Sequence, residues 1–260
     1  MIRNVLKTTL VQSTFGKASL SAAVLIACAT AQPAFAAPAK SPAKAPAKSS
    51  ASLAPRSANW NAQVVAMPDG SYRVGNPDAK VKLNEFVSYT CPHCAEFHKQ
   101  SDPVLRLTSV PRGQLSITVT NLLRNPIDAT VAMLTNCGNP KRFFVRHGAF
   151  FATQDKWMAP LASLSESQRQ RWVQGSMTDR FRAIASDLGF YDMMERWGID
   201  RAQTDACLAD TAVLDKLKQQ QAEVAKLGFD STPSFTLNGE KLDGHDWASV
   251  SKEITARLGK

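Results

Sequence analysis

The chain has 260 residues, of which 44% are hydrophobic, 8% aromatic and 20% charged. This composition is typical of a folded protein large enough to bury one or two cores, and it excludes a disordered or fibrous protein. The longest apolar run covers residues 22–31, whereas a helix that crosses a membrane needs about 20 residues. We therefore expect no transmembrane span once the N-terminal segment has been cleaved.

The formal net charge of +9 is concentrated near the N-terminus. Residues 1–36 hold three basic residues and residues 37–58 hold four, and neither segment has an acidic residue. The rest of the chain carries 24 Lys and Arg against 22 Asp and Glu, a net charge of only +2. A nucleic-acid-binding protein needs a basic patch on a folded face, so we expect no nucleic-acid partner.

Residues 1–36 have the pattern of a signal peptide. Three basic residues precede the apolar segment 20–31, and the small-x-small triplet Ala-Phe-Ala ends at Ala36. This order predicts export and cleavage near Ala36/Ala37. The alternatives are a lipoprotein anchored through Cys28, which ends a Leu-Ile-Ala-Cys sequence, or an uncleaved anchor.

Residues 37–58 are interpreted as an Ala/Pro/Lys-rich disordered linker. They repeat Pro-Ala-Lys and hold no large apolar side chain except Leu53. Such a segment cannot bury enough surface to offset the entropy lost on ordering, so we expect it to act as a solubilising spacer.

Residues 59–124 predict a βαβ unit that opens with a short hairpin. The hairpin strands flank a Pro-Asp-Gly turn, and the next strand is rich in β-branched and aromatic residues. A helix with an internal proline and an alternating strand follow. The predicted segments are 64–67, 72–74, 81–89 (strands), 95–107 (helix) and 115–120 (strand).

Residues 125–210 show only helical periodicity and helix caps, beginning with the cap Asn125-Pro126, and predict an all-helical insertion. Within it, aromatic residues between 143 and 151 share one helix face with His147, which favours core packing. We interpret His147 and His245 as structural or surface residues.

Residues 211–260 predict a helix, a hairpin and a last helix. The helix spans 211–227, the hairpin combines Ser234–Leu237 with an Asn-Gly turn, and the last helix spans about 246–258. Together with the βαβ unit, these elements predict one compact α/β domain that carries the helical insertion.

Cys91-Pro92-His93-Cys94 is the motif that carries chemistry. It stands between a predicted strand and a predicted helix, which places the first sulfur over unpaired backbone N–H groups at the positive end of the helix dipole. This position favours the thiolate of Cys91, and a protonated His93 would add positive charge. We expect a client thiolate to attack an exposed Cys91 sulfur and form a mixed disulfide.

Three further residues are candidates for supporting roles. Glu85 lies among apolar residues on its strand, so burial would raise its pKa and make it a proton acceptor for Cys94; the alternative is a solvated strand-end carboxylate. Cys137 and Cys207 could form a structural disulfide that ties the insertion to the core. The alternative for this pair is two buried free thiols.

The chain resembles the DsbA-type thiol:disulfide oxidoreductases of bacterial envelopes. The resemblance rests on Glu-x5-Cys-Pro-His-Cys after a strand, the helices inserted next, and Thr232-Pro233 before a late strand. It implies a thioredoxin fold, a cis Pro233 opposite Cys91, and Thr232 backbone groups that pair with an extended substrate peptide. It also implies a periplasmic enzyme that oxidises secreted client proteins without a bound cofactor or metal. A membrane quinone-linked thiol oxidase would then reset its cysteines.

Two alternatives remain open. Thr232 resembles the isomerase and more reducing branches of that family, where the best-known oxidases carry Val. An isomerase or reductase would use the same residues and would be kept reduced by a membrane electron donor. The other alternative is a Cu(I)- or Zn(II)-binding protein, with Cys91, His93, Cys94 and His98 as ligands.

Overall fold

The structure is a computed structural model that describes residues 58–259. The predicted signal peptide, the alternative role of Cys28 and the predicted linker up to residue 57 lie outside the described residues. Within residues 58–259, no helix is both long and apolar enough to cross a membrane.

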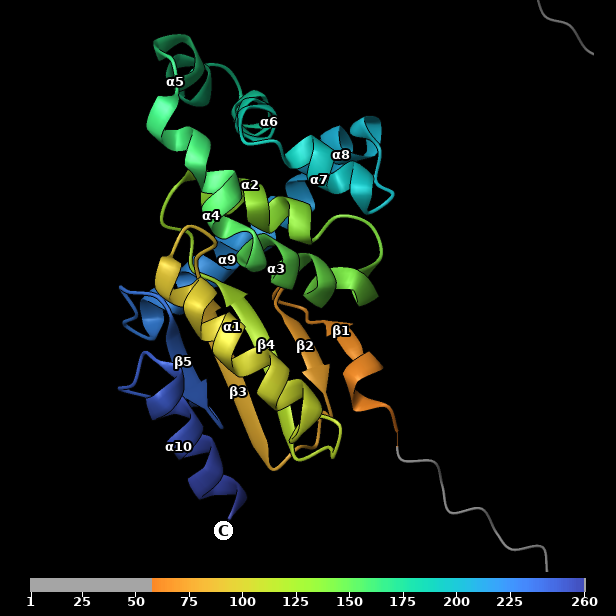
Figure 1. The fold of residues 1–260 in the computed structure, drawn as a ribbon, viewed down its shortest axis with the longest axis vertical. Coiled ribbons are helices and arrows are strands. Elements are labelled where there is room, and N and C mark those ends of the chain that lie inside the picture. Colours follow the sequence, from red (N-terminus) through yellow and green to blue (C-terminus); the bar gives the residue numbers. More distant parts are fainter. Residues whose placement is uncertain (1–57, 260) are drawn as a thin grey trace, which may run out of the picture. The chain divides into compact units, whose positions relative to one another are not determined.

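A six-stranded mixed sheet in the order β1-β2-β4-β3-β5-β6 forms the centre of the fold (Figure 1). The central pair β3 and β4 is parallel, while β2 pairs antiparallel with β4, and β5 pairs antiparallel with β3. A thioredoxin-like arrangement, βαβ followed by ββα, is therefore confirmed. The strands are β1 (Val64–Ala66), β2 (Tyr72–Gly75), β3 (Val81–Val87), β4 (Leu115–Asn121), β5 (Ser234–Leu237) and β6 (Glu240–Lys241).

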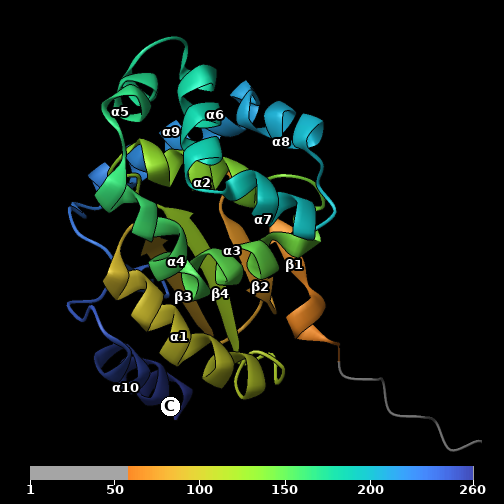
Figure 2. The ribbon, with the colours of Figure 1, turned by 45° about the horizontal axis from the view of Figure 1, so that its top comes forward.

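Helices cover both faces of the sheet (Figures 1 and 2). On one face lie α1 (Pro92–Leu107) and α10 (Trp247–Leu258), where Phe97 of α1 packs against Phe235 and Trp247. On the other face lies α9 (Thr211–Lys226), which contributes Val224 to a small apolar cluster with Phe86 of β3. Successive side chains of β3 point to opposite faces of the sheet, and helices cover both faces. Apolar residues of this central strand therefore occur on both of its sides.

Between β4 and α9 the chain is helical, as expected. Asn125 caps α2 through its side chain, which accepts hydrogen bonds from the backbone N–H groups of Ile127 and Asp128. The helices of this region are α2 (Pro126–Thr135), α3 (Phe143–Ala152), α4 (Gln154–Met158), α5 (Glu166–Val173), α6 (Met177–Asp187), α7 (Phe190–Arg196) and α8 (Arg201–Leu208). We refer to residues 126–208 as the helical region.

The aromatic face of α3 packs into the core, as its spacing predicted. Phe143 stacks on Tyr72 of β2, and Phe150 contacts Phe190 of α7. His147 is buried on the same face and hydrogen-bonds to Tyr89. One helix thus joins the sheet to the helical region through apolar and aromatic contacts.

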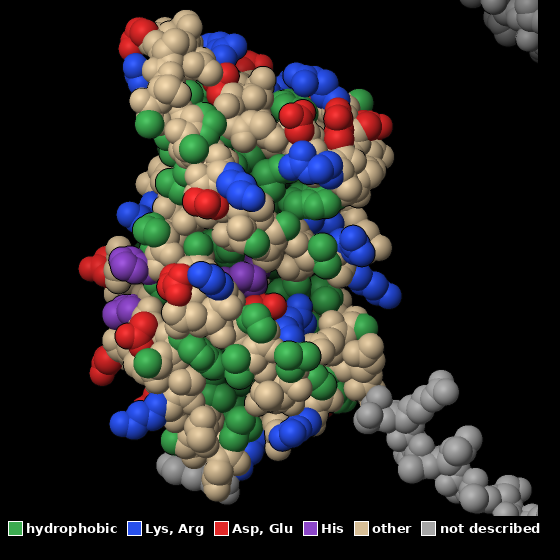
Figure 3. Space-filling model, in the orientation of Figure 1, with side chains coloured by type: hydrophobic (Ala, Val, Ile, Leu, Met, Phe, Trp, Pro, Cys, Tyr) green, Lys and Arg blue, Asp and Glu red, His purple; other side chains and the backbone are tan. Residues whose placement is uncertain are grey.

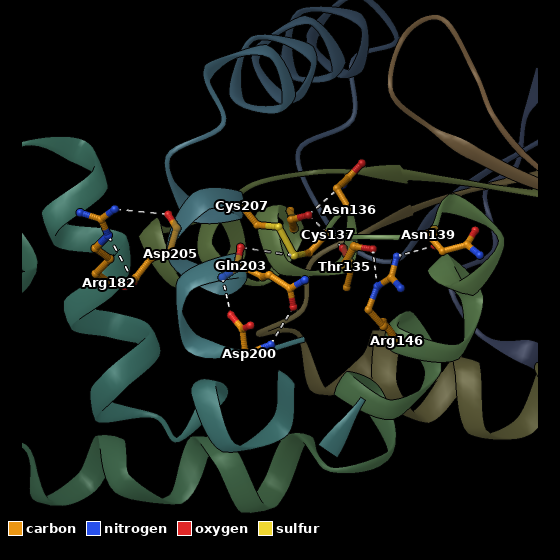
Figure 4. Close-up of a disulfide and its surroundings, with 11 residues drawn as sticks. Thr135, Asn136, Cys137, Asn139, Arg146, Arg182, Asp200, Gln203, Asp205 and Cys207 are labelled. Atoms are coloured by element: carbon orange, nitrogen blue, oxygen red, sulfur yellow. Dashed lines mark hydrogen bonds and ion pairs between the residues drawn. A yellow bond between two sulfur atoms is a disulfide. The ribbon is translucent and has the colours of Figure 1, made fainter. Parts of the chain in front are cut away.

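Cys137 and Cys207 form a disulfide in the structure, with Cα atoms 5.5 Å apart (Figure 4). Cys137 directly follows α2 and Cys207 belongs to α8, so the bond joins two packed elements of the helical region. The expectation that it ties this region to the sheet is wrong, because both cysteines lie on the same side of that junction. Arg146 of α3 adds hydrogen bonds to the carbonyl groups of Thr135 and Asn139.

Charged side chains of both signs are interspersed on the face shown in Figure 3, where they do not gather in one basic patch. Several pair along single helices, such as Arg257 with Glu253 at 2.6 Å. Exposed pairs of this kind contribute little to stability. This surface agrees with the small net charge of the sequence beyond residue 58.

Candidate active site

Helix α1 begins at the motif itself. It starts at Pro92, three residues before the predicted start, because proline fits the first helical position and Cys91 takes the cap position. Cys91 therefore lies at the end of a 16-residue helix, where the N–H groups of the first turn have no partner within the helix. Cys94 lies one turn further on, on the buried face of α1.

The pKa values of the two thiols are shifted in opposite directions. A hydrogen bond from the Cys94 side chain is the largest influence on Cys91, and it outweighs burial to lower the pKa of Cys91 to about 5. Backbone N–H groups of Cys94 and His93 contribute in the same direction. Burial and the neighbouring Cys91 raise the pKa of Cys94 well above its usual value. At neutral pH the site therefore holds one thiolate and one thiol.

The backbone N–H of His93 donates a hydrogen bond to Cys91, and the His93 side chain is exposed. A contribution from a protonated His93 ring stays a prediction. Cys91 was expected to be exposed, but only 2% of its surface is accessible. The loop at residues 232–233 covers it, since Cys91 Sγ lies 3.1 Å from the carbonyl oxygen of Thr232.

The loop that faces Cys91 has the arrangement that the family resemblance implied. The Thr232–Pro233 peptide bond is cis, and Thr232 lies next to the reacting sulfur. His245, which we interpreted as a structural or surface residue, has its Nδ1 2.8 Å from the carbonyl oxygen of Pro233. It therefore holds the loop from the start of α10.

Glu85 is buried on β3, and burial raises its pKa to about 8, with Asp102 raising it further and Arg106 opposing. Its carboxylate adjoins a cavity of about 10 Å³, which is lined by side chains from α1, α3 and β4. Neither active-site cysteine lines this cavity. The solvated alternative is therefore wrong, while a proton-transfer role toward Cys94 remains a prediction.

Sequence reasoning missed a side chain that holds the Cys91 backbone. Gln154 of α4 is buried, and its Nε2 donates to the carbonyl oxygens of Tyr89 at 2.8 Å and Cys91 at 2.9 Å. No local pattern around position 154 signals this contact, because its partners lie more than 60 residues away.

Asp128 is a second residue that sequence reasoning missed. It is fully buried, accepts from Ser88 Oγ at 2.9 Å, and accepts from the backbone N–H groups of Thr90 and Arg124. It thereby fixes the segment between β3 and Cys91. The only sequence signal was its place in the first turn of a capped helix, where acidic residues are favoured for general reasons.

The structure does not bring the proposed metal ligands together. Among residues 58–259, no group of three or more His, Cys, Asp or Glu side chains is arranged to hold a metal ion. His98 instead turns toward His147, with ring centroids 5.1 Å apart.

Comparison with known proteins places this site in a family. Residues 68–256 match the thioredoxin family. The chain belongs to the thioredoxin family. It is 47% identical to the solved structure of a protein-disulfide isomerase from Novosphingobium aromaticivorans, with a TM-score of 0.72, over 75% of this chain and all of that one.

Two further comparisons agree with the fold. Wolbachia pipientis α-DsbA1 is 20% identical with a TM-score of 0.57, over 77% of this chain and 96% of that one. The resemblance to DsbA-type proteins is confirmed at the level of the fold. A Rickettsia bellii protein named as a protein-disulfide oxidoreductase is 25% identical over 183 residues, which are 70% of this chain and 62% of that relative.

Proposed function

We propose that the protein is a thiol:disulfide oxidoreductase that exchanges disulfides with client proteins through Cys91 and Cys94, and that it acts as an oxidase. The single observation that carries the proposal is the contrast between the two sulfurs, a thiolate at Cys91 beside a thiol at Cys94. Thiolate stabilisation favours the reduced pair and so makes the disulfide an oxidant.

The proposed reaction begins with the oxidised pair. A client thiolate attacks Cys91 Sγ and forms a mixed disulfide, while the Cys91–Cys94 bond breaks and Cys94 leaves as a thiolate that takes up a proton. A second client thiolate then attacks the client sulfur of the mixed disulfide. Cys91 leaves as a stabilised thiolate, the client gains a disulfide, and the enzyme pair is left reduced.

The low accessibility of Cys91 adds a requirement to the first step. A client must displace or slide along the loop at Thr232 and Pro233 to reach Sγ. The backbone groups of Thr232 are suited to pair with an extended client segment once it lies there. These two residues are accordingly proposed as the client-binding loop.

The experiment follows a reduced two-cysteine peptide as it is oxidised by the disulfide form of the protein. Cys91→Ser should abolish turnover, whereas Cys94→Ala should accumulate a mixed disulfide that intact-mass analysis detects. Ser167→Ala, a change at an exposed residue of α5 that leaves both sulfurs and the loop in place, serves as the control. A Cys94→Ala protein that captures no peptide would contradict the scheme.

Disulfide isomerisation is the second candidate function. It is favoured by Thr232 before the cis-proline and by the name of the Novosphingobium protein, which is a protein-disulfide isomerase. The reduction potential of the Cys91–Cys94 pair in glutathione buffers separates the two candidates. A potential near −120 mV indicates an oxidase, and one between roughly −180 mV, the value of protein disulfide isomerase, and −270 mV, the value of thioredoxin, indicates an isomerase or reductase.

The remaining elements of the proposal concern location and partners. The N-terminal signal pattern supports export to the periplasm, with secreted proteins as clients. A membrane quinone-linked thiol oxidase would restore the disulfide of an oxidase, and a membrane electron donor would keep an isomerase reduced. Cell fractionation, with a Cys28→Ala variant as the test of lipid anchoring, examines the location.

A further inference from the structure

A small cavity and an open groove meet at two side chains of α1, those of His98 and Asp102. The cavity of about 10 Å³ adjoins Glu85, His98 and His147, and this is about the smallest volume that admits one water molecule. A groove of about 730 Å³ runs between α1, α3 and α4 and opens to solvent. Asp102 is paired with Arg106, whose Nε lies 3.3 Å from Asp102 Oδ1. Glu85 and His147 line only the cavity.

The position of the His98 imidazole depends on Gly148 of α3. A Cβ atom at residue 148 would lie 3.1 Å from His98 Nε2, closer than ordinary van der Waals contact. Gly148 also lines the open groove. The ring therefore occupies space that an ordinary helical residue at 148 would take.

We propose that His98 transfers protons between Glu85, through a water molecule in the small cavity, and the solvent in the open groove. This inference rests on the proposed function and on the predicted proton transfer between Glu85 and Cys94. It makes His98 a positioning and relay residue for the proton, with no contact to the client.

In the oxidase direction, Cys94 must take up one proton when it leaves the disulfide. When the client displaces Cys94, the Cys94 thiolate takes the proton of the Glu85 carboxylic acid and leaves a buried carboxylate. A groove water or buffer acid protonates His98, and the imidazolium passes this proton through the cavity water to Glu85. His98 returns to its neutral form, so one proton has moved from solvent to Cys94.

The groups around His98 are consistent with a transient charge on it. Facing it are Glu85 from β3, Asp102 and Arg106 from α1, and His147 from α3. Glu96 and Lys99 of α1 and Asp155 of α4 line the groove. Burial lowers the pKa of His98, while Asp102 raises it and Arg106 lowers it again. A ring that is neutral at rest and charged only briefly can release its proton to either side.

The test is the single-turnover rate at which a dithiol peptide reduces the oxidised full-length protein, measured in dilute buffer. His98→Gln should slow the reaction about tenfold, less than the about 100-fold or more typical of a group that acts directly on the reacting atoms, because Glu85 remains. Added imidazole, which fits the open groove, should restore most of the rate. Lys252→Gln, an exposed residue of α10 that does not line the groove, should change neither the rate nor its dependence on imidazole.

Two further variants make the result specific. Gly148→Ala should slow the reaction, because the added Cβ displaces the His98 ring while residue 98 is unchanged. This variant provides the test if His98→Gln does not fold. In a Glu85→Gln background, His98→Gln should cause no further loss, because the proton no longer passes that way. Wild-type rates without imidazole dependence in the folded variants overturn the inference. A wild-type protein that does not react with the peptide overturns the proposed function instead.

Discussion

Replacing Cys94 tests the source of the Cys91 acidity. The largest influence that lowers the pKa of Cys91 is the hydrogen bond from the Cys94 side chain. A hydrogen bond to a charged group is worth about 1.5–3 kcal/mol, and one pKa unit corresponds to about 1.4 kcal/mol. Cys94→Ala removes the donor and should raise the pKa of Cys91 from about 5 by about one to two units. Cys94→Ser keeps an O–H donor and should leave the pKa near its wild-type value.

The assay is the rate of alkylation of Cys91 by iodoacetamide between pH 3 and pH 9. Both variants have one thiol at the site, and Cys137 and Cys207 are joined in a disulfide, so among residues 58–259 the titration reports on Cys91 alone. Peptide mass separates any label on Cys28. At pH 6, about 90% of Cys91 should be thiolate in the serine variant, against about 10–50% in the alanine variant. Equal midpoints in the two variants would show that the hydrogen bond does not set the acidity and would refute this reasoning.

Three further predictions concern stability. Burial raises the pKa of Glu85 from its usual 4.5 to about 8, so its contribution to folding is present below pH 4.5 and lost as pH rises toward 8. In urea titrations between pH 4.5 and pH 8, the free energy of unfolding of Glu85→Gln should rise relative to that of the wild type, by at most about 1.4 kcal/mol per pH unit. A difference between the two proteins that does not change with pH would contradict the burial of a titrating Glu85. Replacing Cys137 and Cys207 together by Ser should lower the free energy of unfolding by about 2–4 kcal/mol without slowing alkylation of the active-site thiolate. Asp128→Ala should cost about 2–4 kcal/mol by leaving buried donors unpaired, whereas the exposed Asp192→Ala should cost under about 0.5 kcal/mol in the same melts.

Much of the fold was accessible from sequence because its signals are local. Alternation along β3 and β4, the Asn125-Pro126 cap and the Asn238-Gly239 turn each act within a few residues. The start of α1 was misplaced for the same reason. A proline at the first helical position fits a helix start as well as a turn, and only the packed structure decides between them.

The site was predicted less completely because its support comes from distant segments. Cys91 and Cys94 were identified from their spacing, but the burial of Cys91 depends on Thr232, which lies 141 residues later. The contact of Gln154 likewise has no counterpart in any short pattern. The disulfide pair was identified but assigned to the wrong junction, since parity of cysteines says nothing about which elements pack together.

The two hydrogen bonds of Gln154 make the helical region part of the support of the reacting sulfur. One amide group joins α4 to the carbonyl groups on either side of Thr90, just before α1 begins. If α4 moved away, the buried carbonyl oxygen of Tyr89 would lose its donor from Gln154, and that of Cys91 would keep the N–H of Ala95. The backbone that holds Cys91 is therefore supported by two segments of chain some sixty residues apart. A substitution that shifts either segment should also shift the other.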